Sequence, residues 1–217
     1  TFMKLNLEQQ RAVLHGGGPL LIIAGAGTGK TTVITQKIKH LVQEKNVNPQ
    51  HIFATTFTEK TAAEILERLD TVMPLGYTPP WLGTFHSLCD RLLRQEGLEI
   101  GVDPNFTIMT PADQWMFLKE HLFDLPLSYY RPLGNPGKFI GALASFFSRL
   151  QDEDVSDQEF EAVVAKRLKA AVSDDEKLEA ERIQELYQTY LVYNQLKIKN
   201  SVFDFGDLII KTLHLLR

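Results

Sequence analysis

The sequence has 217 residues, of which 44% are hydrophobic and 23% charged, a composition typical of a globular protein with one sizeable core or two modest ones. Its net charge of −4 excludes recognition of nucleic acid by bulk positive charge, and its single cysteine excludes a disulfide framework and a cysteine-rich zinc site. The longest apolar run, residues 20–24, is too short to cross a bilayer, and the first residues lack the order of a secretory signal, so we expect a cytoplasmic protein with no membrane partner.

Short β-rich runs alternate with helical patterns over the first hundred residues, which is the order typical of a parallel α/β sheet. Residues 20–24 are a continuous apolar run between glycines, and this predicts a buried strand. The other elements predicted in this half are, in chain order, a helix at 31–44, a strand at 52–57, a helix with Ala62 and Leu69 on its inner side, a strand at 81–85 and a helix at 87–95.

A change in composition begins near Gly101. Residues 106–109 still have strand character, but Thr110-Pro111-Ala112-Asp113 combines the hydroxyl, proline and carboxylate that start a helix. Helical periodicity continues to about residue 196, and residues 201–217 end in one more apolar helix. Acidic residues outnumber basic ones only in this second half, so any contact with nucleic acid is expected in the first half, through local geometry.

One glycine-rich segment carries a specific chemistry. Ala24-Gly25-Ala26-Gly27-Thr28-Gly29-Lys30-Thr31 stands between a predicted strand and a predicted helix, which is the context of a P-loop. Small residues let the backbone wrap closely round phosphates, and the helix N-terminus adds positive potential. Lys30 is suited to the β- and γ-phosphates of ATP, and the Thr31 hydroxyl to the accompanying Mg²⁺. The alternative, a tight turn without a ligand, does not explain the positions of the lysine and the threonine.

Four segments outside this loop resemble motifs of the UvrD-like superfamily 1 DNA helicases, and they occur in the order of that family. They are Leu5-Asn6-Leu7-Glu8-Gln9-Gln10-Arg11-Ala12-Val13, similar to the Q-motif; Thr55-Thr56-Phe57-Thr58-Glu59-Lys60-Thr61-Ala62-Ala63-Glu64-Ile65, similar to motif Ia; Gly83-Thr84-Phe85-His86-Ser87-Leu88-Cys89, similar to motif Ib; and Phe203-Asp204-Phe205-Gly206-Asp207-Leu208-Ile209, similar to the "DFDDLI" segment. The order of the motifs is more specific than any one of them.

The resemblance implies a fold and a domain organisation. The fold expected is an α/β P-loop NTPase of the RecA type, a parallel sheet flanked by helices, with an inserted all-α subdomain. Residues 1–109 would form the first part of the RecA-like ATP-binding domain, residues 110–200 the inserted 1B subdomain, and residues 201–217 the return to the RecA-like domain. The activity implied is that of an ATP-dependent 3′–5′ DNA helicase, an ATP hydrolase that acts on single-stranded DNA and duplex junctions. Repair or replication proteins are the further partners expected.

Roles for individual residues follow from the same resemblance. Gln9 would bind the adenine edge, and Lys30 and Thr31 would act in catalysis, Thr31 as the magnesium ligand. The residues expected to bind ATP are Gln9, Ala24, Gly25, Ala26, Gly27, Thr28, Gly29, Lys30, Thr31 and Thr32. The residues expected to bind DNA are Thr56, Phe57, Thr58, Thr84, Phe85, His86 and Ser87, with the Phe57 ring stacked on a base. The alternatives are that Phe57 and Phe85 are core aromatics, that His86 is a structural histidine, and that Gln9 faces solvent.

The sequence departs from the family pattern at three positions. Glu59 replaces an asparagine in motif Ia and brings a carboxylate near the expected DNA, Thr32 replaces an arginine next to the nucleotide, and Gly206 replaces an aspartate. The acidic DExx pair that hydrolysis requires is absent, since Asp204 and Asp207 open a helix and follow no apolar strand. We therefore expect a fragment with weak ATP binding and negligible helicase activity.

Two other functions fit parts of the pattern. The first is a module that binds nucleotide and DNA without turnover, and the second is a P-loop kinase whose helical segment is a lid. The kinase would bind a small phosphoryl acceptor and would be indifferent to single-stranded DNA, so DNA binding distinguishes it from the other two.

Overall fold

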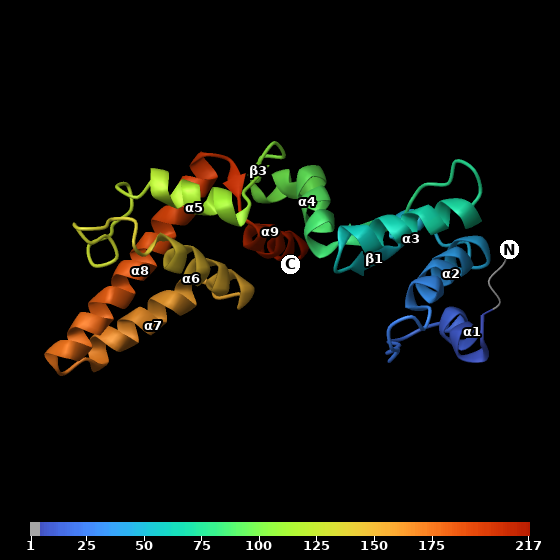
Figure 1. Ribbon diagram of the computed structural model, residues 1–217, viewed down its shortest axis with the longest axis horizontal. Coiled ribbons are helices and arrows are strands. Elements are labelled where there is room, and N and C mark those ends of the chain that lie inside the picture. Colours follow the sequence, from blue (N-terminus) through green and yellow to red (C-terminus); the bar gives the residue numbers. More distant parts are fainter. Residues whose placement is uncertain (1–4) are drawn as a thin grey trace. The chain divides into compact units, whose positions relative to one another are not determined.

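The computed structural model describes residues 5–217 and shows a mixed α/β protein that consists mainly of helices, with two small parallel sheets (Figure 1). The chain divides into two compact units, of which the first ends at Leu88 and the second comprises Cys89–Arg217. The α/β class expected from the sequence is confirmed at this level.

The first unit contains a pair of parallel strands and the helices that accompany them. Its elements are α1 (Leu7–Leu14), α2 (Lys30–Gln43), the short 3-10 helix η1 (Pro49–His51), β1 (Phe53–Thr56), α3 (Glu59–Val72), β2 (Trp81–Thr84) and the beginning of α4 (Phe85–Glu96). In the register of the strands, Phe53 pairs with Trp81 and Thr56 with Thr84. The strands predicted at 52–57 and 81–85 are therefore confirmed, and so are the helices that follow them.

A small apolar core joins α2, α3 and the strands. Ile65 and Leu69 recur at helical spacing on the inner face of α3, and both are buried against Ile38 of α2 and Ile52, which precedes β1. The Thr58 hydroxyl caps α3 by accepting a hydrogen bond from the Thr61 amide at 3.2 Å. This packing fixes the direction in which β1 runs into α3.

The strand predicted at residues 20–24 is wrong for this structure. The segment pairs with no strand among residues 5–217, and its side chains are largely exposed, with Leu21 at 84% and Ile23 at 91%. A β-strand exists only where a neighbouring strand accepts and donates its backbone hydrogen bonds. An apolar run indicates that a segment is suited to burial, but it does not indicate which strand or helix would cover the segment.

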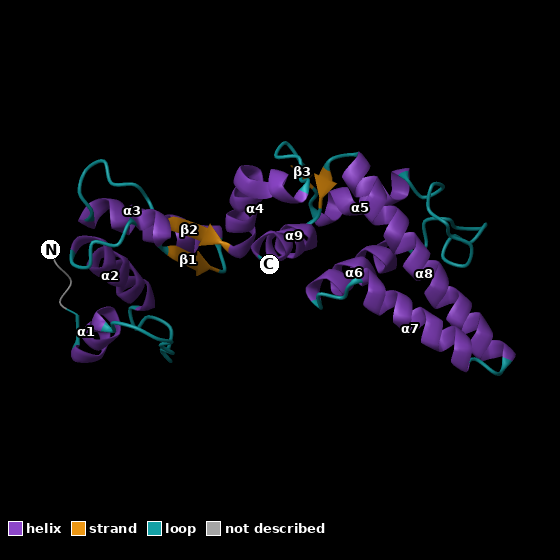
Figure 2. Cartoon of the chain, turned by 180° about the vertical axis from the view of Figure 1, so that it is seen from behind, coloured by secondary structure: helices purple, strands orange, loops and turns teal. Residues whose placement is uncertain are grey.

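The second unit is almost entirely helical (Figure 2). Its elements after α4 are η2 (Gly97–Ile100), β3 (Thr107–Ile108), α5 (Pro111–Glu120), α6 (Ile140–Asp152), α7 (Asp157–Ala170), α8 (Asp174–Lys199), β4 (Val202–Phe203) and α9 (Phe205–Leu216). The helix start predicted at Thr110 is confirmed, since its hydroxyl accepts from the Asp113 amide and the Asp113 carboxylate accepts from the Thr110 amide.

The short strands β3 and β4 pair in parallel, with Thr107 opposite Val202 and Ile108 opposite Phe203. After β3 the chain forms α5 to α8, and it then returns to the same sheet as β4, which pairs with β3. The main core of the unit lies among these helices around Phe147 and Tyr193, which stack with ring centroids 5.0 Å apart. Among residues 5–217, none of the helices combines the length and the apolar character that a bilayer crossing requires.

Candidate functional site

The glycine-rich loop before α2 has backbone angles that suit its glycines. Gly27 and Gly29 have φ values of +76° and +88°, in the left-handed region that side chains rarely adopt. Gly29 is the residue that precedes α2, so the free amides of the first helical turn face the loop. The Thr28 hydroxyl donates to the Gly25 carbonyl at 2.8 Å and closes the turn. The loop thus exposes its backbone at a helix N-terminus.

Lys30 lies over the loop from the first position of α2. Its ammonium donates to the carbonyl oxygens of Gly25, at 2.6 Å, and of Ala24, at 3.2 Å. An ammonium group has three donors, so these two bonds leave one for another acceptor. The cation and the amides of the helix start are hydrogen-bond donors that suit a phosphate chain. The oxygen of the neighbouring Thr31 hydroxyl suits a magnesium ion bound to the phosphates.

Gln9 contacts the same loop from α1. Its side-chain amide donates to the Thr28 carbonyl at 3.0 Å, and its carbonyl oxygen accepts from the Asn6 amide at 3.0 Å. A Cβ added at Gly29 would lie 2.8 Å from this amide nitrogen, so the glycine is required for the close approach. Gln9 is half-buried, and its side chain joins the first helix to the loop.

Lys37 of α2 holds α1 in this position. Its ammonium donates to the carbonyls of Val13, at 3.0 Å, and of His15, both at the end of α1. The last carbonyls of a helix lack partners within it and carry partial negative charge, so a lysine stabilises them. Thr32, the second hydroxyl after Lys30, accepts a long hydrogen bond of 3.5 Å from Arg68 of α3. Arg68 thus contacts Thr32, the residue that stands where the resemblance leads us to expect an arginine.

The ends of β1 and β2 bring the residues predicted to bind DNA to one edge of the sheet. Thr56 and Thr84 are paired in register, and the carboxyl ends of parallel strands lie at the same edge. Thr58 caps α3, and the Thr84 hydroxyl accepts from the Ser87 amide at 3.2 Å at the start of α4. Two helices therefore begin at this edge, each with a threonine hydroxyl at its first turn.

The two phenylalanines at this edge are not part of a core. Phe57 is 95% exposed and Phe85 is 52% exposed, so the alternative of core aromatics is wrong for both. His86 is also exposed, while Ser87 is half-buried and its hydroxyl would lie 2.5 Å from a Cβ at Gly83. An exposed ring beside hydroxyls is an arrangement that can stack on an unpaired base without regard to sequence.

Glu59 makes a contact that its place in the sequence does not predict. The Thr84 hydroxyl donates to the Glu59 carboxylate at 2.6 Å, which ties the first turn of α3 to the end of β2. The departure from the family pattern at residue 59 was visible in the sequence, but the identity of its partner depends on the pairing of β1 with β2.

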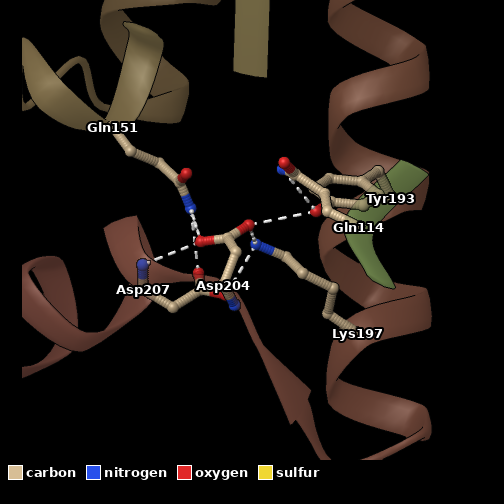
Figure 3. Close-up of polar contacts among 6 residues, drawn as sticks. All are labelled: Gln114, Gln151, Tyr193, Lys197, Asp204 and Asp207. Carbon is tan, nitrogen blue, oxygen red and sulfur yellow. Dashed lines mark hydrogen bonds and ion pairs between the residues drawn. The ribbon is translucent and has the colours of Figure 1, made fainter. Parts of the chain in front are cut away.

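In the second unit, Asp204 and Asp207 belong to a buried polar network (Figure 3). Lys197, only 2% exposed, donates to Asp204 at 2.8 Å and to Asp207 at 2.7 Å. The Gln151 amide donates to both carboxylates at 3.0 Å, and the Tyr193 hydroxyl donates to Asp204 at 3.0 Å. The two aspartates also form the capping box of α9, which confirms the prediction that they open a helix.

The charges in this network adjust one another. Burial acts to lower the pKa of Lys197, but the two carboxylates outweigh it and hold this pKa above its usual value. Burial acts to raise the pKa of Asp204, yet the Lys197 charge and its hydrogen bond keep this pKa below the usual value. Burial raises the pKa of Asp207, against the opposing effect of Lys197. Both carboxylates are committed to Lys197 and to the start of α9, so their role is structural.

The second unit also has a cavity of about 390 Å³, lined in part by Tyr190, Lys197, Lys211 and His214. None of the residues predicted to bind ATP or DNA lines it. Within residues 5–217, no three histidine, cysteine, aspartate or glutamate side chains gather as a metal site.

The class of protein follows from comparison with known families. The family model described as the UvrD/REP helicase N-terminal domain matches residues 5–217, and the chain belongs to this family. The resemblance of the sequence motifs to those of the UvrD-like superfamily 1 helicases is thereby confirmed.

Individual relatives agree with this assignment. The chain is 36% identical over 211 residues to the ATP-dependent DNA helicase PcrA of Bacillus subtilis, a match that covers 97% of this chain and 26% of that protein. The PcrA helicase of Staphylococcus aureus is also 36% identical over 211 residues, with the same coverage of both chains. The chain thus spans about a quarter of the length of these relatives.

Proposed function

We propose that this chain is the ATP- and single-stranded-DNA-binding front part of an ATP-dependent 3′–5′ DNA helicase. Family membership supports the general assignment, and the relatives named above are ATP-dependent DNA helicases. The observation that carries the proposal is the convergence of Lys30 and Gln9 on one glycine-rich loop at the start of α2.

In this proposal the loop holds the triphosphate of ATP. The backbone of residues 24–29 and the amides at the start of α2 bind the phosphates, and Lys30 exchanges its bonds to the Gly25 and Ala24 carbonyls for phosphate oxygens. Thr31 would hold Mg²⁺, which would supply positive charge to the phosphates. Thr32 lies next to them, and Gln9 turns its amide from the Thr28 carbonyl to the adenine.

DNA would bind at the carboxyl ends of β1 and β2. Phe57 stacks on an unpaired base, and the phosphates lie near the hydroxyls and helix starts of this edge. The residues assigned to this contact are Thr56, Phe57, Thr58, Thr84, Phe85, His86 and Ser87. The whole protein would act on single strands and duplex junctions in the cytoplasm, with repair or replication proteins as partners.

The proposed domain organisation is a RecA-like P-loop domain that is interrupted by a helical insertion. Residues 1–109 and 201–217 belong to the RecA-like domain, and residues 110–200 are the inserted 1B subdomain. The parallel pairing of β3 with β4 supports this boundary, since the chain leaves at Ile108 and returns at Val202 to adjacent strands. An insertion whose two ends lie side by side interrupts a fold with little disturbance.

Fluorescence anisotropy with a labelled oligothymidylate tests the DNA site. Phe57→Ala is expected to weaken binding about tenfold, because stacking of one base on an aromatic ring contributes about 1–3 kcal/mol. Phe123→Ala is the matched control, since Phe123 is also an exposed phenylalanine but lies in the second unit. Equal affinities of the wild type and Phe57→Ala would contradict the proposed DNA site, and indifference of the wild type to DNA would favour a P-loop kinase.

A further inference from the structure

The hydrogen bond between Glu59 and Thr84 lies inside the proposed DNA site. Glu59 is the first residue of α3 and Thr84 the last residue of β2, and the distance from the Thr84 hydroxyl to the carboxylate is 2.6 Å. Glu59 is exposed and Thr84 is half-buried. The carboxylate is thus accessible to solvent while it binds a hydroxyl assigned to the DNA backbone.

The Thr84 hydroxyl has no second hydrogen to offer. A hydroxyl donates once, and this oxygen already accepts from the Ser87 amide at 3.2 Å. The oxygens of Glu59 and Ser87 lie 2.6 and 3.0 Å from it, and the shorter, charge-assisted bond to Glu59 takes the hydrogen. The Ser87 hydroxyl in turn donates to the Thr84 carbonyl at 3.1 Å. A phosphate oxygen can therefore receive the Thr84 hydrogen only if Glu59 releases it.

We propose that Glu59 is an intramolecular competitor of the DNA phosphate for the Thr84 hydroxyl, and that it thereby weakens the binding of the DNA backbone at this edge. The inference rests on the proposed function, since it concerns the same site. Glu59 occupies the first turn of α3, where the positive end of the helix dipole favours any anion, a carboxylate as well as a phosphate. A phosphate that approaches meets both the charge of Glu59 and a donor that is already engaged.

The test compares the affinities of four proteins for a fluorescein-labelled oligothymidylate at one salt concentration, because phosphate contacts depend strongly on salt. These are the wild type, Glu59→Ala, Glu59→Gln and the control Glu67→Ala. Glu67 is an exposed residue of α3 about 12 Å farther along the helix axis, and its removal changes the net charge equally. Glu59→Gln keeps an acceptor for Thr84 and removes only the charge, so it perturbs the fold least.

Glu59→Ala is expected to bind the oligonucleotide about fivefold more tightly than the wild type, and Glu59→Gln by a smaller factor. In a Thr84→Val background the gain from Glu59→Ala is expected to shrink, because the contested hydroxyl is absent. Glu67→Ala is expected to bind as the wild type does. Tightening by both Glu59 variants, with the reduced effect in Thr84→Val, supports competition.

Other outcomes overturn the inference in distinguishable ways. If Glu67→Ala tightens binding as much as Glu59→Ala, the effect is one of net charge and the competition is refuted. If neither Glu59 variant changes the affinity while Phe57→Ala weakens it, the competition is wrong and the proposed DNA site stands. If Phe57→Ala is also without effect, the proposed function itself fails.

Discussion

At the scale of single residues, the sequence predicts a chemistry for the loop before α2, but it does not predict the contacts of the loop's side chains. Lys30 follows Gly29 by one position and lies over the loop through bonds to carbonyls five and six residues away. Gln9 reaches the same loop from 19 residues away, and the resemblance of its segment to the Q-motif does not show that its partner is the Thr28 carbonyl. Local spacing predicts a residue's chemistry, and only the packing of α1 on α2 decides which neighbour it meets.

Lys30→Met tests the nucleotide site at this scale. Methionine keeps the length of the side chain and removes the charge, so affinity for a fluorescent ATP analogue in magnesium buffer is expected to fall about tenfold or more. Lys45→Met is the control, because Lys45 is an exposed lysine just after α2. Retention of wild-type affinity by Lys30→Met would argue against phosphate binding at the loop.

At the scale of elements, the helices with predicted caps and the strands that pair with another strand lie where the sequence predicts them. β1 and β2 were predicted within two residues of their ends, and α5 begins at the predicted cap. The run at residues 20–24 was predicted with equal reason and forms no strand, since pairing requires a second strand. The tight fit of Gly206 against Gln151 was invisible in the sequence, because these residues lie on different helices, α9 and α6.

Gly206→Ala is expected to destabilise the protein, although a change from glycine to alanine within a helix is usually stabilising. Alanine at a helical glycine normally stabilises by about 1 kcal/mol. Here the added Cβ would collide with the Gln151 amide oxygen and would lie 2.8 Å from the Gln151 Cβ, so overpacking is expected to cost about 1–3 kcal/mol. Urea unfolding measures the difference, and the cost should shrink in a Gln151→Ala background. A more stable Gly206→Ala protein would show that the helices separate easily.

At the scale of the whole molecule, the two units have separate cores. The core around Ile65 and Leu69 belongs to the first unit, and the core around Phe147 and the network around Lys197 belong to the second. The sequence indicated a change in composition near Gly101, whereas the division of the chain into compact units falls between Leu88 and Cys89, within α4. Since a continuous helix gives no compositional signal, this division could be seen only in three dimensions.

Lys197→Met tests whether the units also behave separately. Two buried carboxylates would lose their cation, with an expected cost of about 3–5 kcal/mol. Hydrogen exchange should rise in α6, α8 and α9 and stay unchanged in α2 and α3. Lys199→Met, at the exposed end of α8, is the control. Equal loss of protection in α2 and α3 would show that the molecule unfolds as one.

The same lysine predicts a pH dependence. The pKa of Lys197 is raised above its usual 10.5, so its contribution to stability is complete below that value and is lost as the pH rises through the higher folded value. Lys197→Met should lack this part of the alkaline loss of stability.

The sequence by itself determined the starts of the capped helices, because these depend on residues within a few positions of one another, and it determined the family, because several short motifs occur in the order of that family. The tertiary structure decided that Gln9 meets Thr28, that Thr84 binds Glu59 and that Gln151 binds Asp204, which are 19, 25 and 53 residues apart. It also decided that residues 20–24 have no strand beside them within residues 5–217. A periodic pattern shows which face of a segment is apolar, but the partner of that face is chosen by the packing of elements that are distant in the chain.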